Sequence, residues 1–301
     1  MRNILVILIV TLLIACTEKE PGGQGPVTAQ NKPMVVTSNY PLYFFSSEIA
    51  GDLVDVRFPS IEGDPAMWVP GGDEAIMLQS ADLLILNGAG YESWLSFTTL
   101  SGENIVDTTA NVQSMLLPIE NTTVHQHGPQ GKHSHQGTAF TTWLDPELAI
   151  EQSRSILQAV TQLKPDQAEL FKTNFDQLEK RLRQLDQSLE QSFAKLAAQP
   201  IVFSHPVYQY LQHRYQINGR SLHWEPGIEP GTRDWIELGK LLQAHPAKLM
   251  VWEETPLNST RDRLTEMGVH SVVFNPAANP GKPTDYFEMM NKNTDQITAP
   301  K

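Results

Sequence analysis

The sequence predicts an α/β protein with two parallel-sheet lobes joined by one long rigid helix. Short apolar runs alternate with helical segments before residue 146, and the same alternation resumes after residue 199. An unbroken helical pattern lies between the two regions. Alternating strands and helices are typical of parallel strands linked by crossover helices. We therefore expect a first lobe at 33–145, a helical connection at 146–198 and a second lobe at 199–301.

The first lobe is predicted from strand-like runs that are each followed by a helical segment. Strands are expected at 34–37, 54–58 and 83–86, and helices at 40–49, at 73–80 and from 91–95 onward. The run Leu83-Leu84-Ile85-Leu86 is continuously apolar, as in a buried strand. The next residues, Asn87-Gly88-Ala89-Gly90, predict a turn because glycine adopts backbone conformations that other residues avoid.

Two helices are predicted between the lobes. Asp145 can cap the first, with Pro146 at its first position, and this helix continues to about Leu163. The second runs from Pro165 to about Ala198, roughly 33 residues or about 50 Å. Its apolar residues form one stripe, at Phe171, Phe175, Leu178, Leu182, Leu185, Leu189, Phe193 and Leu196. A coiled coil with a partner is the alternative, but resumption of the strand–helix pattern favours a spine along both lobes.

The second lobe carries the candidate ligands of a binding cleft. Strands are expected at 200–203, 221–222, 248–252 and 271–274, with helices at 208–215, 234–244 and 259–267. In open parallel sheets, ligands bind beyond the carboxyl ends of the strands. The residues that follow these strands include His205, His223, Glu225 and Glu253. Imidazole and carboxylate together suit zinc or manganese, whereas the alternative for each residue is a hydrogen-bonded loop position.

The strand ends of the first lobe offer few good metal ligands. Asn39-Tyr40-Pro41 follows its first strand and Asn87-Gly88 follows its third. Three aromatic residues, Trp68, Tyr91 and Trp143, are expected to pack inside the protein or to line the cleft wall.

Residues 125–137 form a histidine-rich segment. It contains His125, His127, His133 and His135, four of the nine histidines in the chain. Imidazole is the usual nitrogen ligand for zinc, copper and nickel. Glycine and proline are expected to keep the segment out of helix and strand, which predicts a mobile loop that captures transition metals. The alternative is a solvated spacer.

The N-terminus predicts export and lipid attachment. An apolar run of about twelve residues ends at Ala15, which is too short to span a bilayer and fits a signal peptide. Leu13-Ile14-Ala15-Cys16 resembles a lipobox, and Cys16 is the only cysteine, so no internal disulfide can form. We expect residues 1–15 to be removed, Cys16 to carry lipid and 16–32 to form a flexible tether. The domain would then lie in the bacterial cell envelope, outside the cytoplasm.

Composition narrows the class of function. The formal net charge is −12 and no run of lysine or arginine occurs, so nucleic acid is not an expected partner. No nucleophile stands with a base, and no His-Glu-x-x-His motif is present, so we expect a binding protein and not an enzyme. A zinc hydrolase built on His205, Glu225 and Glu253 is a less favoured alternative.

Several segments together resemble the zinc/manganese solute-binding proteins of ABC importers. They are 36–42, 81–88, Trp143-Leu144-Asp145-Pro146, Phe203-Ser204-His205 and Val251-Trp252-Glu253. The resemblance covers about residues 34–290 and implies two α/β lobes joined by a rigid helix. It also implies a lipid-anchored protein that captures zinc, or alternatively manganese, and delivers it to an ABC-transporter permease.

The resemblance places the family's usual metal ligands at four positions, of which His205 alone keeps its residue type. The other three positions hold Ala66, Thr141 and Asn275. Two compensations are open: His133 or His135 enters the cleft, or the second lobe forms the site from its own His205, His223, Glu225 and Glu253. Two further alternatives keep the fold, namely a cleft for a small non-metal solute and a surface lipoprotein that binds another macromolecule.

Overall fold

The computed structural model describes residues 32–59, 61, 67–100, 104–119, 124–126, 132–134, 137–196, 199–280 and 285–298. Lys32–Lys301 forms one compact unit. The predicted signal peptide, Cys16 and the tether up to residue 31 lie outside the described residues. Among the helices of the described part, none is long and apolar enough to cross a membrane.

The first sheet is parallel and contains four strands. They are β1 (Met34–Thr37), β2 (Asp55–Arg57), β3 (Leu83–Leu86) and β4 (Ile105–Asp107), in the order β2-β1-β3-β4. Helix α1 (Tyr40–Ala50) follows β1, and α2 (Gly72–Ser80) follows β2. Strand β4 was not predicted. The helix expected from 91–95 onward is a short 3-10 helix, Ser93–Phe97.

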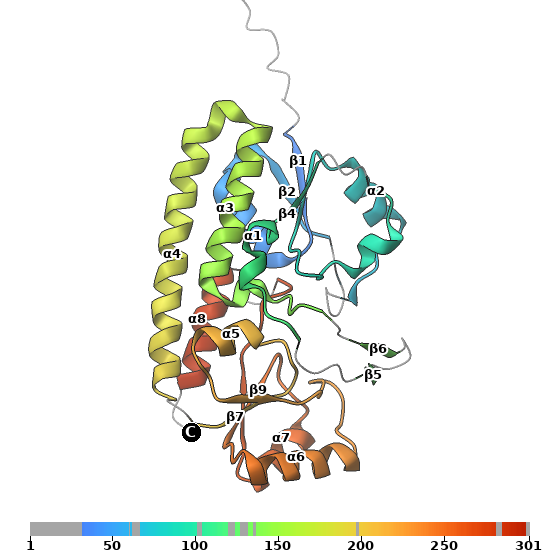
Figure 1. Cartoon of the computed structure of the whole chain (residues 1–301), viewed down its shortest axis with the longest axis vertical. Coiled ribbons are helices and arrows are strands. Elements are labelled where there is room, and N and C mark those ends of the chain that lie inside the picture. The colour runs from blue at the N-terminus through green and yellow to red at the C-terminus, as the bar shows by residue number, and fades with distance from the viewer. Residues whose placement is uncertain are drawn as a thin grey trace, which may run out of the picture. The chain divides into compact units, whose positions relative to one another are not determined.

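The second sheet repeats this topology. Strands β7 (Ile201–Phe203), β8 (Gly219–Ser221), β9 (Leu249–Trp252) and β10 (His270–Val273) are parallel, in the order β10-β9-β7-β8. In each sheet, therefore, the first and third strands are central neighbours. Helices α5 (Gln209–Arg214), α6 (Thr232–Ala244) and α7 (Asn258–Glu266) connect the strands, and α8 (Tyr286–Thr298) follows the last one. Figure 1 shows the first sheet in the upper half of the view and the second in the lower half.

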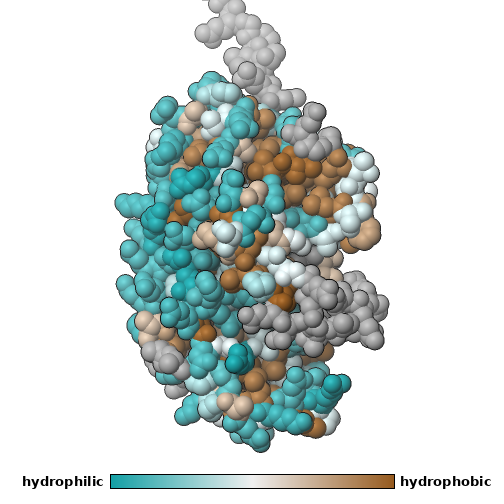
Figure 2. Space-filling model, in the orientation of Figure 1, coloured by the Kyte–Doolittle hydropathy of each residue, from teal (hydrophilic) through white to brown (hydrophobic). Residues whose placement is uncertain are grey.

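Helices α3 (Pro146–Leu163) and α4 (Ala168–Ala194) join the lobes. As predicted, Asp145 caps α3 by accepting a hydrogen bond from the Glu147 amide, at 2.9 Å. Helix α4 has 27 residues and is shorter than expected, because Pro165–Gln167 forms a separate 3-10 turn before it. Its stripe from Phe171 to Phe193 is buried, and the helix packs against both α1 and α8. The opposite side of α4 is hydrophilic (Figure 2).

One core runs through both lobes. Alternate residues of a strand face opposite sides of its sheet. Ile201 and Phe203 therefore join a core that also contains Val35 of the first sheet and the buried stripe of α4. Val202 faces the other way, into a smaller core with α6 and α7. Val36 of the first sheet likewise faces α2. Each sheet is thus covered on both faces, and the shared core fixes the two lobes to each other.

The histidine-rich segment contains two short strands, so the prediction that it lacks helix and strand was wrong. Strand β5 (Val124–Gln126) pairs antiparallel with β6 (Lys132–Ser134), and His125 lies opposite His133 in the register. In the sequence, Gly128, Pro129 and Gly131 lie between the two strands and Gly137 follows the second, so none lies within a strand. Antiparallel pairing gives each strand backbone partners that the sequence pattern alone did not reveal. His127 and His135 lie outside the described residues.

The remaining short helices are of the 3-10 type. They are Gly51–Leu53, Ala110–Met115 and Thr142–Leu144. The last of these carries Trp143 into the boundary between the lobes, where its indole N–H donates to the Pro276 carbonyl at 2.6 Å.

Candidate functional site

His205 and Glu253 meet at the carboxyl edge of the second sheet. His205 follows β7 and Glu253 follows β9, and these two strands pair with Phe203 opposite Val251. In this strand order the chain leaves the two central strands in opposite directions, which is where open α/β sheets bind their ligands. His205 Nδ1 lies 3.0 Å from Glu253 Oε1. Two of the predicted residues are therefore brought into direct contact.

The segment after β8 brings His223 and Glu225 to the same edge. The Trp224 amide donates to the Ser204 carbonyl at 2.7 Å, which holds this segment beside the one that carries His205. His205 Nε2 lies 3.9 Å from Glu225 Oε1, and the His205 and His223 ring centroids are 5.9 Å apart. The other three predicted residues of the second lobe, His223, Glu225 and Glu253, thus lie around the His205 ring.

The arrangement orients the imidazole of His205. A carboxylate on Nδ1 fixes the ring tautomer and directs Nε2 toward a bound ion, as in many metal sites. The side chains of His205, Glu225 and Glu253 are 14%, 35% and 24% exposed, but the Nε2 atom of His205 is itself buried. Within the described residues, no three His, Cys, Asp or Glu side chains are already grouped to hold a metal ion. Coordination would require His223 or Glu225 to turn toward Nε2.

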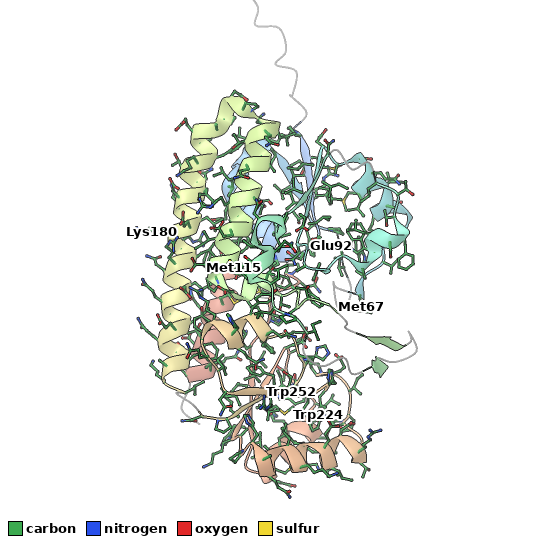
Figure 3. The ribbon with its side chains drawn as sticks, viewed as in Figure 1. Met67, Glu92, Met115, Lys180, Trp224 and Trp252 are labelled. Carbon is green, nitrogen blue, oxygen red and sulfur yellow. The ribbon has the colours of Figure 1, made fainter. Side chains whose placement is uncertain are left out.

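A tryptophan cluster supports the site from inside the lobe. The Trp224 ring lies 4.9 Å from that of Trp235 and 6.1 Å from that of Trp252 (Figure 3). Trp224 and Trp252 are buried, and each directly adjoins a site residue in the sequence, His223 or Glu253. Close-packed aromatic rings resist displacement, so they hold the backbone of both ligand-bearing segments in place.

The corresponding edge of the first sheet is a buried hydrogen-bond network. Asn39 Nδ2 donates to Asn87 Oδ1 at 3.2 Å, and both residues are fully buried. Asn87 Oδ1 also accepts from Thr142 and Gln152, while Asn87 Nδ2 donates to the Phe140 carbonyl. The amide group of Asn87 is therefore fully engaged within the protein, as expected for a buried polar group that has a structural role.

Glu92 is a buried carboxylate next to this network. It accepts hydrogen bonds from the amides of Asn87 and Gly88, at 2.6 and 3.1 Å. Burial raises the pKa of Glu92 to about 7, although these hydrogen bonds oppose the shift. Gly88 has φ +78°, and a side chain there would collide with Asp107, so the turn that holds Glu92 requires glycine. Figure 3 labels Glu92 inside the first lobe.

Of the three residues that the resemblance predicts at ligand positions but that are not typical ligands, Thr141 and Asn275 have partners within the protein. The Thr141 hydroxyl donates to the Val207 carbonyl at 2.6 Å and so links the lobes two residues after His205. Asn275 Oδ1 accepts from the Ala277 amide at 2.7 Å, within its own turn. Ala66 lies outside the described residues. The side chains of Thr141 and Asn275 are therefore committed to the fold.

Two of the three predicted aromatic residues, Tyr91 and Trp143, are buried inside the protein, and Trp68 is partly buried. Trp143 and Tyr91 are 1% and 2% exposed, and their rings make an edge contact with centroids 5.7 Å apart. Trp68 is partly buried against Trp94. Tyr91 and Trp143 therefore pack in the core that both lobes share, whereas Trp68 packs against the smaller core of the first lobe.

Leu117 and Ala139, on the two segments that flank the histidine-rich hairpin, form what we call its stem. Tyr210 attaches this stem to the second lobe. The Tyr210 hydroxyl donates to the Ala139 carbonyl at 2.7 Å and accepts from the Leu117 amide at 3.2 Å. Ala139 and Leu117 are themselves joined across the stem by a backbone hydrogen bond. Tyr210 belongs to α5, the helix that follows β7 and His205, so the segments flanking the hairpin are bonded to the second lobe.

Comparison with known proteins identifies the family. The model of the family described as zinc-uptake complex component A, periplasmic (ZnuA), matches residues 35–299. This chain belongs to the ZnuA family. The predicted resemblance is thereby confirmed.

Two relatives illustrate the range of the ZnuA family. The zinc-binding lipoprotein AdcA of Streptococcus pneumoniae is 25% identical over 280 residues, which cover 91% of this chain. The chain spans only 54% of the length of AdcA. The high-affinity zinc uptake system protein ZnuA of Bacillus subtilis is also 25% identical, and the match covers 95% of this chain and 92% of the relative.

Solved structures confirm the predicted fold of two α/β lobes. The metal-dependent lipoprotein YcdH of Bacillus subtilis superposes with a TM-score of 0.75 at 22% identity, covering 89% of this chain and 98% of that one. The periplasmic zinc-binding protein TroA of Treponema pallidum gives a TM-score of 0.72 at 20% identity, covering 89% and 98%.

Glu92 and Tyr210 were not predicted from the sequence. The two hydrogen-bond partners of Tyr210 are 93 and 71 residues away in the chain, so no local pattern indicates them. Glu92 does follow a glycine-rich turn at a strand end, the same kind of position that drew attention to His205. That rule, applied equally to both lobes, would have found it.

Proposed function

We propose that this chain is an extracytoplasmic binding protein that captures zinc and delivers it to the permease of an ABC importer. It acts as a binding protein and not as an enzyme. The observation that carries the proposal is the contact between His205 and Glu253 at the binding edge of the second sheet. Family membership and the names of the relatives, which refer to zinc binding and uptake, support the same cargo.

In the proposed complex, His205 Nε2 binds the ion and Glu253 orients the ring from Nδ1. Glu225, on the Nε2 side at 3.9 Å, and His223 supply further donors after small side-chain rotations. Imidazole donors suit zinc better than manganese, because manganese prefers oxygen ligands. Zinc is therefore the proposed cargo, and manganese is the alternative. Thr141 and Asn275 stay in their structural hydrogen bonds.

A substitution of His205 tests this assignment. His205→Ala is expected to weaken the tightest zinc site at least about tenfold, or about 1.4 kcal/mol, because a principal donor is lost. Competition titration against a zinc chelator of known affinity measures the change. His270→Ala is the matched control, since His270 is an exposed histidine of β10 at the start of its strand. Unchanged affinity in His205→Ala would sink the proposal and favour a small organic solute as the ligand.

We also propose that the histidine-rich hairpin collects zinc before it reaches His205. Support comes from the register that sets His125 opposite His133, and from the hydrogen bonds that attach the stem to α5, the helix that follows His205. Deletion of residues 125–136 is expected to remove weak zinc-binding events from a calorimetric titration without unfolding the protein, because the stem lies outside the deletion. An unchanged isotherm would mean that the hairpin is a spacer.

Anchoring at the outer face of the cytoplasmic membrane, or in the periplasm, completes the proposal. It rests on the apolar N-terminal run that ends at Ala15 and is followed directly by Cys16, the only cysteine. Cys16→Ser is expected to release the protein from membranes. Retention of this variant on membranes after a carbonate wash would contradict lipid attachment.

A further inference from the structure

Arg214 binds three carboxylates at the start of α3 and on α4. Its Nε and Nη2 atoms lie 2.6 and 2.5 Å from the two oxygens of Asp186, and its Nη1 atom lies 3.1 Å from Asp145. Glu147 lies 3.3 Å from Nη2. The side chains of Arg214 and Asp145 are 22% and 9% exposed. A forked guanidinium contact that is partly buried is stronger and more directional than an ion pair on the open surface.

These ion pairs join the second lobe to the helices between the lobes. Arg214 is the last residue of α5, the short helix that follows β7 and His205. Asp145 caps α3, and Asp186 lies on α4. Tyr215 strengthens the contact, because its hydroxyl donates to Asp186 at 2.8 Å. The carboxyl end of α5 is therefore fastened to both helices.

The amino end of α5 is fastened to the segment 139–145. The Tyr210 hydroxyl donates to the Ala139 carbonyl at 2.7 Å, and the Thr141 hydroxyl donates to the Val207 carbonyl at 2.6 Å. Helix α5 also packs on the short 3-10 helix within this segment. Since Asp145 ends the same segment, one stretch of chain provides partners at both ends of α5.

His205 lies in the turn between β7 and α5, so the position of the helix affects the position of the His205 ring. The Val207 amide donates to the His205 carbonyl at 3.0 Å, which makes this turn tight. A displacement of α5 would therefore be passed on to His205 over very few residues. Without the guanidinium of Arg214, the carboxylates of Asp145 and Asp186 would lose their shared cation and disturb the place where α5 is docked.

We infer that Arg214 is a positioning residue for the zinc site, because it holds α5 on the segment 139–145 and on α4 and so keeps His205 within reach of Glu253. This inference rests on the proposed function, since it concerns the same site. It assigns control of the contact between His205 and Glu253, 3.0 Å long, to an ion cluster that lies outside the binding edge.

The experiment compares Arg214→Gln with Arg181→Gln in the full chain. Arg181 is a matched control, because it also joins separate elements. It pairs with Glu48 of α1 and with Asp285 before α8, and its Cζ atom lies 4.0 Å from the centre of the Phe287 ring. Competition titration measures zinc affinity, and urea denaturation measures the free energy of unfolding. Hydrogen–deuterium exchange of the zinc-free proteins measures local opening of the backbone at 204–214.

We expect both variants to lose stability, because each breaks ion pairs between elements. Only Arg214→Gln is expected to weaken zinc binding, by about fivefold, and to speed amide exchange at 204–214. Arg214→Lys keeps the charge but lacks the fork that engages both oxygens of Asp186, so its affinity should fall by about threefold. If Arg214→Gln fails to fold, the same comparison is made with Arg214→Lys.

Two results would overturn the inference and leave the proposed function intact. One is equal loss of zinc affinity in the Arg214 and Arg181 variants, which would indicate a general effect of lower stability. The other is unchanged amide exchange at 204–214 in zinc-free Arg214→Gln, or zinc affinity within about twofold of the parent, while His205→Ala still weakens binding. If His205→Ala binds zinc as tightly as the parent, the proposed function fails and the inference fails with it.

Discussion

The two sheets of this protein share one topology but use their binding edges differently. In each sheet, the residues that follow the first and third strands touch at the point where the chain directions diverge. The first pair is Asn39 and Asn87, with donor and acceptor 3.2 Å apart, and the second is His205 and Glu253, at 3.0 Å. The asparagine pair is fully buried, whereas the His205 and Glu253 side chains are 14% and 24% exposed.

This difference shows that the position in the fold does not by itself make a binding site. At the first edge every polar group of the Asn87 side chain has a partner within the protein, so nothing is left to attract a ligand. At the second edge the side chains are an imidazole and carboxylates that are partly exposed, although His205 Nε2 is itself buried. The same backbone geometry therefore stabilises the fold in one lobe and offers a site in the other.

The largest expected effect is a loss of stability when the buried hydrogen-bond network at the first edge is disrupted. Asn87→Ala removes the common acceptor of Asn39, Thr142 and Gln152, which leaves buried donors without a partner. We expect the free energy of unfolding to fall by about 3 to 4 kcal/mol. Urea denaturation measures it, and Asn104→Ala, at an exposed position, is the control. The zinc affinity of the folded protein is expected to stay within about twofold. If Asn87→Ala lost much of its zinc affinity but kept normal stability, the first edge would contribute to binding and not to stability, contrary to the roles assigned here.

The next effect is a pH dependence located at the first edge. The pKa of Glu92 is raised by burial from 4.5 to about 7, so the folded protein holds this proton more tightly than the unfolded chain. The Glu92 contribution to the free energy of unfolding must therefore decrease as pH rises from about 4.5 to 7, by about 3 kcal/mol at most.

Glu92→Gln is expected to remove this part of the pH dependence and to lower stability at pH 5, because an amide cannot accept from both neighbouring backbone amides. Denaturation curves at pH 5 and pH 8 measure the slope, with Glu190→Gln on the exposed side of α4 as the control. If Glu92→Gln leaves the slope between these pH values intact, Glu92 does not titrate there.

The smallest of the three effects concerns the exposed edge. Glu253→Ala is expected to weaken zinc binding about tenfold, or about 1.4 kcal/mol, because the His205 ring loses the group that orients it. Glu253→Gln should lose less, since its amide oxygen still accepts from Nδ1. Stability should change little in either variant. Glu254→Ala, at the exposed neighbouring position, serves as the control in the same competition titration. Equal losses in the Ala and Gln variants would indicate that Glu253 binds the ion directly.

The sequence alone predicted most helices and strands, but it did not predict which distant segments pair with one another. Runs such as Leu83-Leu84-Ile85-Leu86 and the stripe of α4 were placed correctly, because burial imposes a periodicity on local sequence. Strand β4, helix α8 and the pairing of β5 with β6 were not predicted. Their patterns are short or weak, and their partners lie in other parts of the chain.

The sequence by itself determined the fold class, the family and the second-lobe residues that follow strand ends. Each of these depends on local pattern or on the order of short segments, which a linear chain records. Only the tertiary structure decided which of those residues touch, and that Thr141 and Asn275 are occupied by backbone partners. The physical reason is that hydrogen bonds and burial depend on residues far apart in the sequence. His205 and Glu253 lie 3.0 Å apart because two parallel strands end side by side.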